Sequence, residues 1–135
     1  MNQVISRLFI GDKNALAAPL RSLGFVGAVD LRDGDPPGPR DIEVHHVTNR
    51  DGDAWNREQV LSTLDFISKQ ILKGKVLVAC TAGMSRSASM TIGYLVRTGW
   101  DPIDAYNRVK EVRPIIAPYT AMIDSVLKVA CEGSK

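Results

Sequence analysis

The spacing of apolar and polar residues along the chain predicts strands mainly in its first half and helices mainly in its second half. The segments 26–31 and 42–47 are predicted as strands, and apolar residues alternate with polar ones through the second of them. Residues 75–79, Lys-Val-Leu-Val-Ala, form a nearly continuous apolar run that is typical of a buried central strand. The segment 11–23, between a first strand and the strand at 26–31, is predicted to be helical.

Helical periodicity is clearest between residues 56 and 73, where apolar residues stand at positions 60, 64, 67 and 71. Asn56 followed by Gln59 matches a capping box, and Gly74 is expected to end this helix. Asp101 followed by Pro102 has the pattern of a cap with proline at the first helical position. Three further helices are predicted, from Arg86 to about Gly99, from Asp101 to about Val112, and from about Tyr119 to Cys131.

These elements predict a single α/β domain over residues 1–135, with a short, largely parallel central sheet flanked by helices. The chain has 135 residues, of which 44% are hydrophobic and 24% are charged, as is usual for one globular domain. The turn-rich segment 32–40 is too short to link two domains.

Composition disfavours several functional classes. The chain has no run of about 18 apolar residues and its start lacks the design of an export signal, so we expect a cytoplasmic protein without a membrane partner. The net charge of +2 comes from scattered Lys and Arg rather than a basic stripe, so nucleic acid is not an expected partner. The two cysteines, Cys80 and Cys131, are expected to remain thiols in that compartment.

The segment that follows the strand at 75–79 carries the chemistry. It reads Cys-Thr-Ala-Gly-Met-Ser-Arg-Ser, with small residues between the cysteine and an arginine that opens a helix. Small residues let the backbone curl so that several N–H groups point inward, and the helix N-terminus adds partial positive charge. We therefore predict a phosphate-binding loop between the central strand and a helix, with the substrate-binding residues Thr81, Ala82, Gly83, Met84, Ser85 and Arg86.

Cys80 is the predicted nucleophile, because the same loop favours a thiolate over a thiol. Arg86 is predicted to hold two phosphate oxygens through its planar guanidinium group. Ser87 is predicted to donate a hydrogen bond to the sulfur as the sulfur leaves phosphorus, and Ser85 is predicted to brace the loop. The reaction would pass through a phosphocysteine.

Expulsion of the leaving group requires a proton donor, and the segment 49–55 contains two carboxylic acids. This segment follows the strand at 42–47, so it is expected to open at the same edge of the sheet as the cysteine. We predict that Asp51 is the general acid. Asp53 lies closer to the next helix, where a carboxylate is explained by helix capping.

The motif resembles that of the dual-specificity protein tyrosine phosphatases, whose signature is His-Cys, five residues, Arg, and then Ser or Thr. The segment 79–87 reads Ala-Cys-Thr-Ala-Gly-Met-Ser-Arg-Ser. The segments 6–11, 23–31 and 113–118 also resemble the family, so the resemblance covers nearly the whole chain. It implies a shallow site that acts on phosphorylated proteins, at phosphotyrosine and at phosphoserine or phosphothreonine, with no metal and no cofactor.

Two residues depart from the family pattern. Ala79 stands where the family usually has histidine, which removes one contributor to loop order and to thiolate formation. We therefore expect the activity optimum at a higher pH than is usual in the family. Tyr119 stands where the family often has asparagine, so one hydrogen bond behind the loop is expected to be absent and the ring is expected to wall the pocket.

Alternatives remain open on the sequence alone. Cys80 could be a buried core thiol, as is common for a cysteine after an apolar strand. With Ala79 in place of histidine, the domain could bind phosphate without turnover. The same chemistry could also act on a phosphoinositide, a nucleotide or an RNA 5′ end, although the loop contains no lysine for a highly charged ligand.

The remaining residues of interest have structural interpretations. Neighbouring strand residues such as His45 and His46 point to opposite faces, so a shared metal ion is not expected. Cys131, at the end of the last predicted helix, is interpreted as structural or incidental, and both Trp55 and Trp100 as packing residues. The sequence does not indicate an oligomeric state.

Overall fold

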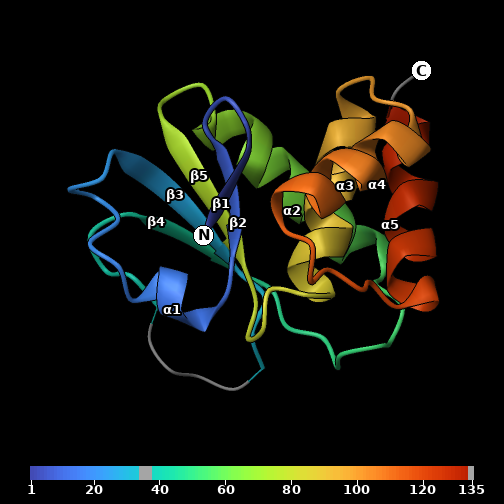
Figure 1. Ribbon diagram of the computed structural model, residues 1–135, viewed down its shortest axis with the longest axis horizontal. Helices are drawn as coiled ribbons and strands as arrows, with labels where there is room; N and C mark the ends of the chain where they lie inside the picture. Colours follow the sequence, from blue (N-terminus) through green and yellow to red (C-terminus); the bar gives the residue numbers. More distant parts are fainter. Residues whose placement is uncertain (34–37, 134–135) are drawn as a thin grey trace.

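The computed structural model describes residues 1–33 and 38–133. Its strands form one sheet (Figure 1) and are β1 (Asn2–Ile5), β2 (Leu8–Gly11), β3 (Phe25–Asp30), β4 (Glu43–His46) and β5 (Lys75–Ala79). The strand order is β1-β2-β5-β3-β4, with β1 antiparallel to β2 and all other neighbours parallel. This is the short, largely parallel sheet that the sequence predicts.

β5 lies in the middle of the sheet, paired with β2 on one side and β3 on the other. Its residues 76–79 are fully buried, which explains the continuous apolar sequence of this strand. The last residue, Ala79, is in register with Gly11 at the end of β2 and with Asp30 at the end of β3. The residue after β5 therefore emerges between the ends of two neighbouring strands.

Helices cover the two faces of the sheet unequally (Figure 1). The single-turn helix α1 (Lys13–Leu16) packs on one face, over a small apolar cluster. The longer helices pack on the other face and are α2 (Arg57–Gln70), α3 (Arg86–Arg97), α4 (Pro102–Val112) and α5 (Thr120–Gly133). Among the described helices, none is long and apolar enough to cross a membrane.

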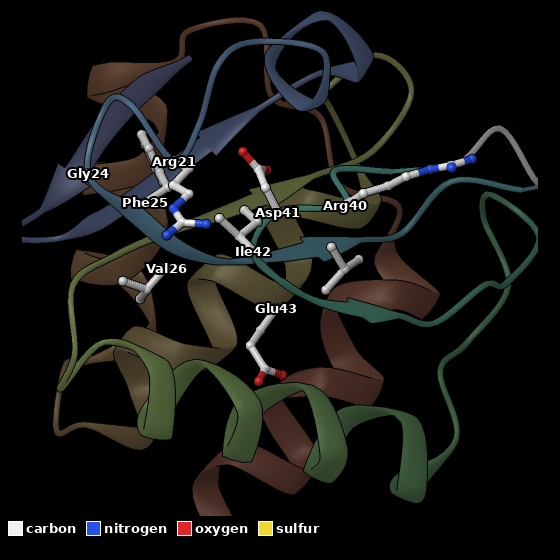
Figure 2. Close-up of a pocket in the computed structure, with 9 residues that line it drawn as sticks. Arg21, Gly24, Phe25, Val26, Arg40, Asp41, Ile42 and Glu43 are labelled. Atoms are coloured by element: carbon white, nitrogen blue, oxygen red, sulfur yellow. The ribbon is translucent and has the colours of Figure 1, made fainter.

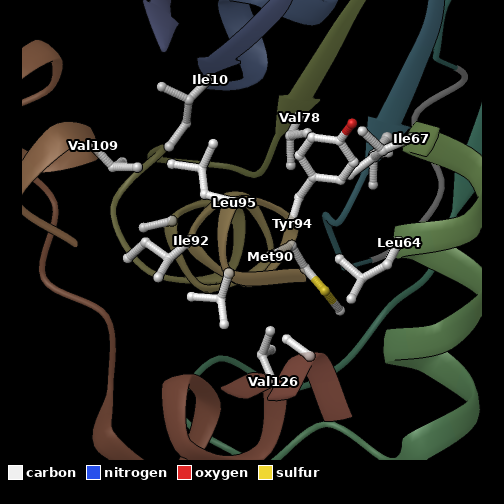
Figure 3. Packing of buried hydrophobic residues seen from close by; sticks show 14 of the residues in the cluster. Ile10, Leu64, Ile67, Val78, Met90, Ile92, Tyr94, Leu95, Val109 and Val126 are labelled. Carbon is white, nitrogen blue, oxygen red and sulfur yellow. The ribbon is translucent and has the colours of Figure 1, made fainter. Parts of the chain in front are cut away.

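The main core is built around α3. Figure 3 shows Ile10 of the sheet, Leu64 of α2, Val109 of α4 and Val126 of α5 surrounding the side chains of this helix. Every residue of α3 except Arg97 is buried. The position of the helix, and of the residue that opens it, is therefore set by the surrounding sheet and helices.

The helix predicted over 11–23 is wrong in its extent. Only α1 is helical, and it begins after Asp12, whose carboxylate accepts the N–H groups of Asn14 and Ala15 at 2.9 and 3.2 Å. Pro19 explains the early end, because a proline disfavours the helical conformation at the residue before it and has no N–H to donate. The chain then continues as turns to β3.

The edge strand β1 is not predicted by the sequence pattern. It is joined to β2 by a tight turn in which Arg7 has a φ of 67°. The Arg7 side chain donates to the carbonyl oxygen of Ile71 at 3.0 Å, just beyond α2. This contact explains how a non-glycine residue is held in a left-handed conformation.

The later helices confirm the sequence prediction closely. Asn56 and Gln59 form the predicted capping box at the start of α2, which ends at Gln70 rather than at residue 73. Asp101 accepts the N–H groups of two residues in the first turn of α4. The predicted turn-rich segment 32–40 includes residues 34–37, which lie outside the described residues.

Candidate active site

Cys80 follows directly on the buried central strand β5. The residue is 3% exposed, and its N–H donates to the carbonyl oxygen of Gly11 at 3.4 Å. The carbonyl oxygen of Thr81 accepts the N–H of Lys13 at 3.2 Å. The end of β5 is thus tied to the segment that follows β2, and the sheet fixes where the thiol opens.

Residues 81–85, which we call the cysteine loop, connect Cys80 to α3. Among the described residues, no group of the chain accepts a hydrogen bond from the backbone N–H groups of this loop. Gly83 has a φ of 68°, a conformation that suits glycine. Ser85 occupies the N-cap position of α3 without a capping hydrogen bond. Free N–H groups beside an uncapped helix N-terminus form a site suited to an anion.

Ser85 braces the cysteine loop, as predicted. Its hydroxyl oxygen accepts the N–H of Tyr119 at 3.2 Å, and its hydroxyl group donates to the sulfur of Met122 at 3.4 Å. In the same region the carbonyl oxygen of Met84 accepts the N–H of Ala117 at 2.8 Å. These contacts join the loop to the start of α5.

Arg86 opens α3, and its side chain is only 7% exposed. Its Nη1 donates to the carbonyl oxygen of Asn49 at 3.4 Å, and its Nη2 donates to Thr81 Oγ1 at 3.3 Å. Its Nε is buried and has no hydrogen-bond acceptor among the described residues. A phosphate oxygen would supply one, because guanidinium N–H groups pair readily with phosphate.

Two carboxylates flank the guanidinium group of Arg86. Asp33 Oδ1 lies 3.3 Å from Nη1, and Asp51 Oδ1 lies 3.8 Å from Nε. The Asp33 and Asp51 side chains are 60% and 46% exposed, and Asp33 also accepts the hydroxyl of Thr48 at 3.0 Å. Sequence reasoning did not single out Asp33, because it lies in a turn-rich segment without a motif.

Asp51 and Asp53 belong to residues 49–55, which we call the acid loop. Asp51 lines the same cavity as Cys80, whereas Asp53 does not line it. The N–H of Asp53 donates to the carbonyl oxygen of Arg50 at 3.1 Å, so Asp53 closes a turn. Of the two candidate acids, the structure brings Asp51 to the cysteine.

Ser87 is fully buried in the first turn of α3. The thiol of Cys80 donates to its hydroxyl oxygen at 3.2 Å. When the sulfur is a thiolate, the direction reverses, because only the hydroxyl then carries a proton. The geometry therefore allows Ser87 to donate to a negatively charged sulfur.

A cavity of about 460 Å³ opens over the cysteine loop. Gly83 and Ser87 are the predicted site residues that do not line it. The lining residues are Asp51, Cys80, Thr81, Ala82, Met84, Ser85, Arg86, Ala117 and Tyr119.

Arg113 lies behind the cysteine loop, and sequence reasoning gave it no individual role. Its Nε donates to the carbonyl oxygen of Gly83 at 2.8 Å, and its Nη2 donates to that of Ala82 at 3.2 Å. Its Nη1 donates to Asn2 Oδ1 at 2.8 Å, and Asp12 Oδ2 lies 3.7 Å from Nη2. The one sequence signal was the family-like segment that begins at Arg113.

The two departures from the family pattern have clear places in the structure. Ala79 is fully buried in the apolar cluster beneath α1, where it contributes no polar group. Tyr119 is 53% exposed and lines the cavity, as predicted, and its ring faces Gly52 of the acid loop. The ring thus walls the cavity on the side of α5.

A second cavity, of about 750 Å³, lies at the beginnings of β3 and β4 (Figure 2). Its lining mixes cations and carboxylates, namely Arg21, Arg40, Asp41 and Glu43. Figure 2 shows Arg40 extending away from Arg21, so the two guanidinium groups do not converge on one ligand. None of the predicted site residues lines this cavity.

His45 and His46 contact different parts of the fold. His45 Nε2 lies 3.1 Å from Thr63 Oγ1 on α2, and His46 Nε2 lies 3.1 Å from the carbonyl oxygen of Arg32. Burial, together with the charge of His46, lowers the pKa of His45. Within residues 1–33 and 38–133, no three His, Cys, Asp or Glu side chains are grouped so as to hold a metal ion.

Comparison with known proteins identifies relatives over nearly the entire chain. The family model described as dual specificity phosphatase, catalytic domain, matches residues 8–130. Human dual specificity protein phosphatase 16 is 32% identical over 123 residues, which are 86% of this chain and 18% of that protein. Human dual specificity protein phosphatase 8 is 40% identical over 68 residues, or 49% of this chain and 11% of that protein. The chain spans less than a fifth of the length of these two relatives.

Solved structures share the fold from end to end. Human DUSP28 superposes with a TM-score of 0.85 at 25% identity, over 96% of this chain and 95% of that chain. The human tyrosine phosphatase-like serine/threonine/tyrosine-interacting protein superposes with a TM-score of 0.82 at 26% identity, over 95% and 93%. These matches confirm the predicted α/β fold. Since the family model also spans residues 8–130, the chain belongs to the family of dual specificity phosphatase catalytic domains.

Proposed function

We propose that this domain hydrolyses phosphomonoesters on proteins, at phosphotyrosine and at phosphoserine or phosphothreonine, through a phosphocysteine formed on Cys80. One observation carries the proposal. The backbone N–H groups of the cysteine loop and the buried Nε of Arg86 have no hydrogen-bond acceptor among the described residues, and Arg86 and most residues of this loop line the same cavity as Cys80. An oxyanion bound there would place its central atom beside the nucleophile.

In the first step, the thiolate of Cys80 attacks phosphorus, and a sulfur–phosphorus bond forms as the bond to the leaving oxygen breaks. Asp51 gives its proton to that oxygen, so the product leaves as an alcohol or phenol. In the second step, water attacks phosphorus and gives a proton back to Asp51. The sulfur leaves as a thiolate that accepts a hydrogen bond from Ser87, and inorganic phosphate is released.

Arg86 is assigned the electrostatic part of the reaction. Its planar N–H groups would hold two phosphate oxygens and follow them as the phosphoryl group flattens in the transition state. Thr81, Ala82, Gly83, Met84 and Ser85 would contribute backbone N–H groups to the same oxygens. The loop thus holds the phosphate rather than the group that carries it.

The lining of the cavity favours a phosphorylated protein side chain over a highly charged small molecule. Arg86 is the cationic residue of its lining, whereas a phosphoinositide would present several phosphates. The wall formed by Met84, Ala117 and Tyr119 is suited to the ring of a phosphotyrosine.

Phosphate release from a phosphotyrosine peptide and a phosphothreonine peptide tests the proposal. We expect turnover by the wild type and none by Cys80→Ser. Asp51→Asn is expected to lower kcat/KM by about 10²-fold or more, the usual scale of general acid catalysis. Asp53→Asn is the matched control and should retain most activity. Mass spectrometry of acid-quenched wild type should show a phosphate on Cys80.

Two results would redirect the proposal. Phosphopeptide binding without turnover at any pH would identify a phosphate-binding module, the alternative raised by Ala79. A larger loss in Asp53→Asn than in Asp51→Asn would move the general acid to Asp53.

A further inference from the structure

Trp55 ends the acid loop and is 4% exposed, in the core beside α3. Its indole N–H donates to Ser89 Oγ at 3.1 Å, in a buried hydrogen bond. The Ser89 hydroxyl in turn donates to the carbonyl oxygen of Arg86 at 2.8 Å. Because that hydroxyl proton is committed to the carbonyl, the serine oxygen is oriented to accept the indole N–H.

A second bond holds the backbone of the same residue. The N–H of Trp55 donates to Ser125 Oγ at 2.9 Å, and the Ser125 hydroxyl donates to the carbonyl oxygen of Met122 at 2.8 Å. Met122 is also the residue whose sulfur accepts the hydroxyl of Ser85 in the cysteine loop. Both bonds therefore connect Trp55 to elements that hold the candidate phosphate site.

The other end of the acid loop is tied to the same arginine. The carbonyl oxygen of Asn49 accepts Arg86 Nη1 at 3.4 Å. The Asn49 side chain donates across the loop to the carbonyl oxygens of Ala54 at 2.9 Å and Asp53 at 3.3 Å. Asp51 thus lies on a loop bonded at one end to the Arg86 side chain and at the other, through Ser89, to the Arg86 carbonyl.

We infer that Trp55 is a positioning residue that holds Asp51 in place for proton transfer, with Ser89 as the link through which the acid loop is aligned on Arg86. The inference rests on the proposed function. A role in core packing would require only the ring of Trp55, whereas alignment of the acid loop on Arg86 requires the indole N–H. A phenylalanine keeps an aromatic ring in the core and removes only the hydrogen bond.

The chemistry of the leaving group distinguishes alignment from packing. An acid accelerates departure most when the leaving oxygen is strongly basic, as in phenyl phosphate, whose phenol resembles a tyrosine of pKa about 10. 2,4-Dinitrophenyl phosphate releases a weakly basic oxygen and gains little from an acid. Misplacement of Asp51 should therefore slow hydrolysis of phenyl phosphate and leave hydrolysis of 2,4-dinitrophenyl phosphate nearly unchanged.

The experiment compares kcat/KM of Trp55→Phe and wild type on these two substrates. For phenyl phosphate we expect a loss of about tenfold, part of the 10²-fold or more that general acid catalysis supplies. For 2,4-dinitrophenyl phosphate we expect a change within about twofold. Ser89→Ala should reproduce the pattern, and the double variant should lose little more than either single variant. Trp100→Phe, at the far end of α3, is the matched control.

An equal loss on both substrates, or no loss on phenyl phosphate, overturns the inference. If Trp55→Phe does not fold, Ser89→Ala decides the question by the same pair of substrates. Asp51→Asn separates this inference from the proposed function. If Asp51→Asn loses more kcat/KM on phenyl phosphate than on 2,4-dinitrophenyl phosphate and Trp55→Phe does not, only the role of Trp55 is removed. If Asp51→Asn shows no such difference between the two substrates, the proposed general acid is removed as well.

Discussion

The guanidinium group of Arg113 donates to the carbonyl oxygen of Gly83 at 2.8 Å, and Arg113 does not line the cavity over the cysteine loop. It also donates to the carbonyl oxygen of Ala82 at 3.2 Å. In a trans peptide the N–H points opposite to the C=O, so holding these two carbonyl groups turns the N–H groups of Gly83 and Met84 away from Arg113. Arg113 thus organises part of the candidate anion site from behind.

Arg113→Lys should weaken phosphate binding, because a single ammonium group cannot hold both carbonyl groups and Asn2 in the same geometry. We expect the inhibition constant for inorganic phosphate to rise about tenfold, equivalent to about 1.4 kcal/mol. Arg108→Lys is the matched control, since Arg108 also donates to a backbone carbonyl, that of Val4, but away from the loop. Equal inhibition constants in the two variants would remove the assigned role of Arg113.

Gly83→Ala should abolish activity. Gly83 has a φ of 68°, and a Cβ atom there would lie 2.5 Å from Arg113 Nη2 and 2.8 Å from the carbonyl oxygen of Gly11. Gly99→Ala is the matched control, because Gly99 has a φ of 114° but nothing within 4 Å of an added Cβ. Gly99→Ala should cost about 1 kcal/mol in urea unfolding and leave kcat/KM nearly unchanged. Activity in Gly83→Ala would show that the cysteine loop can function with a different backbone conformation at residue 83.

Most of the fold could be predicted because its signals are local. The capping box of Asn56 and Gln59 and the cap at Asp101 each involve residues within one helical turn. The prediction over 11–23 was wrong in its extent because Pro19 disfavours continuation of the helix, and α1 ends at Leu16. β1 has no local signature of comparable strength.

The candidate site likewise contains residues whose placement local sequence predicts and residues whose placement it does not. Cys80 and Arg86 are placed by seven consecutive residues, so their proximity follows from the loop itself. Asp33, Arg113 and Trp55 each contact residues about 30 or more positions away, in the cysteine loop or the first turn of α3. Nothing in a single sequence states which distant residues meet, so these partners emerged only from the structure.

Asp33→Asn should strengthen the binding of inorganic phosphate. The Asp33 carboxylate lies 3.3 Å from Arg86 Nη1 and adds negative charge beside the group that would hold the phosphate. Exposed ion pairs are worth little, so we expect an inhibition constant about two- to fivefold lower, with the difference shrinking as salt is added. Asp53→Asn provides the control for removing a nearby exposed carboxylate. Weaker phosphate binding in Asp33→Asn would instead show that Asp33 positions Arg86.

His45 should make the fold less stable at mildly acidic pH. It belongs to β4 and contacts α2, with Nε2 3.1 Å from Thr63 Oγ1 and its ring stacked on Phe66 at a centroid distance of 5.2 Å. The Thr63 hydroxyl donates to the carbonyl oxygen of Gln59 at 2.7 Å, so its oxygen is free to accept the N–H of a neutral imidazole. Burial, and secondarily His46, lowers the pKa of His45 below its ordinary value of 6.5.

The direction of the pH effect follows from that lowered pKa. When the pH falls below about 6.5, the unfolded chain protonates this histidine more readily than the folded protein, so unfolding takes up protons and stability decreases. Urea unfolding between about pH 5 and pH 8 should show this slope in the wild type and a smaller slope in His45→Gln. His46→Gln should retain most of it, because burial is the larger cause. Identical slopes in the wild type and His45→Gln would place the pH dependence elsewhere in the protein.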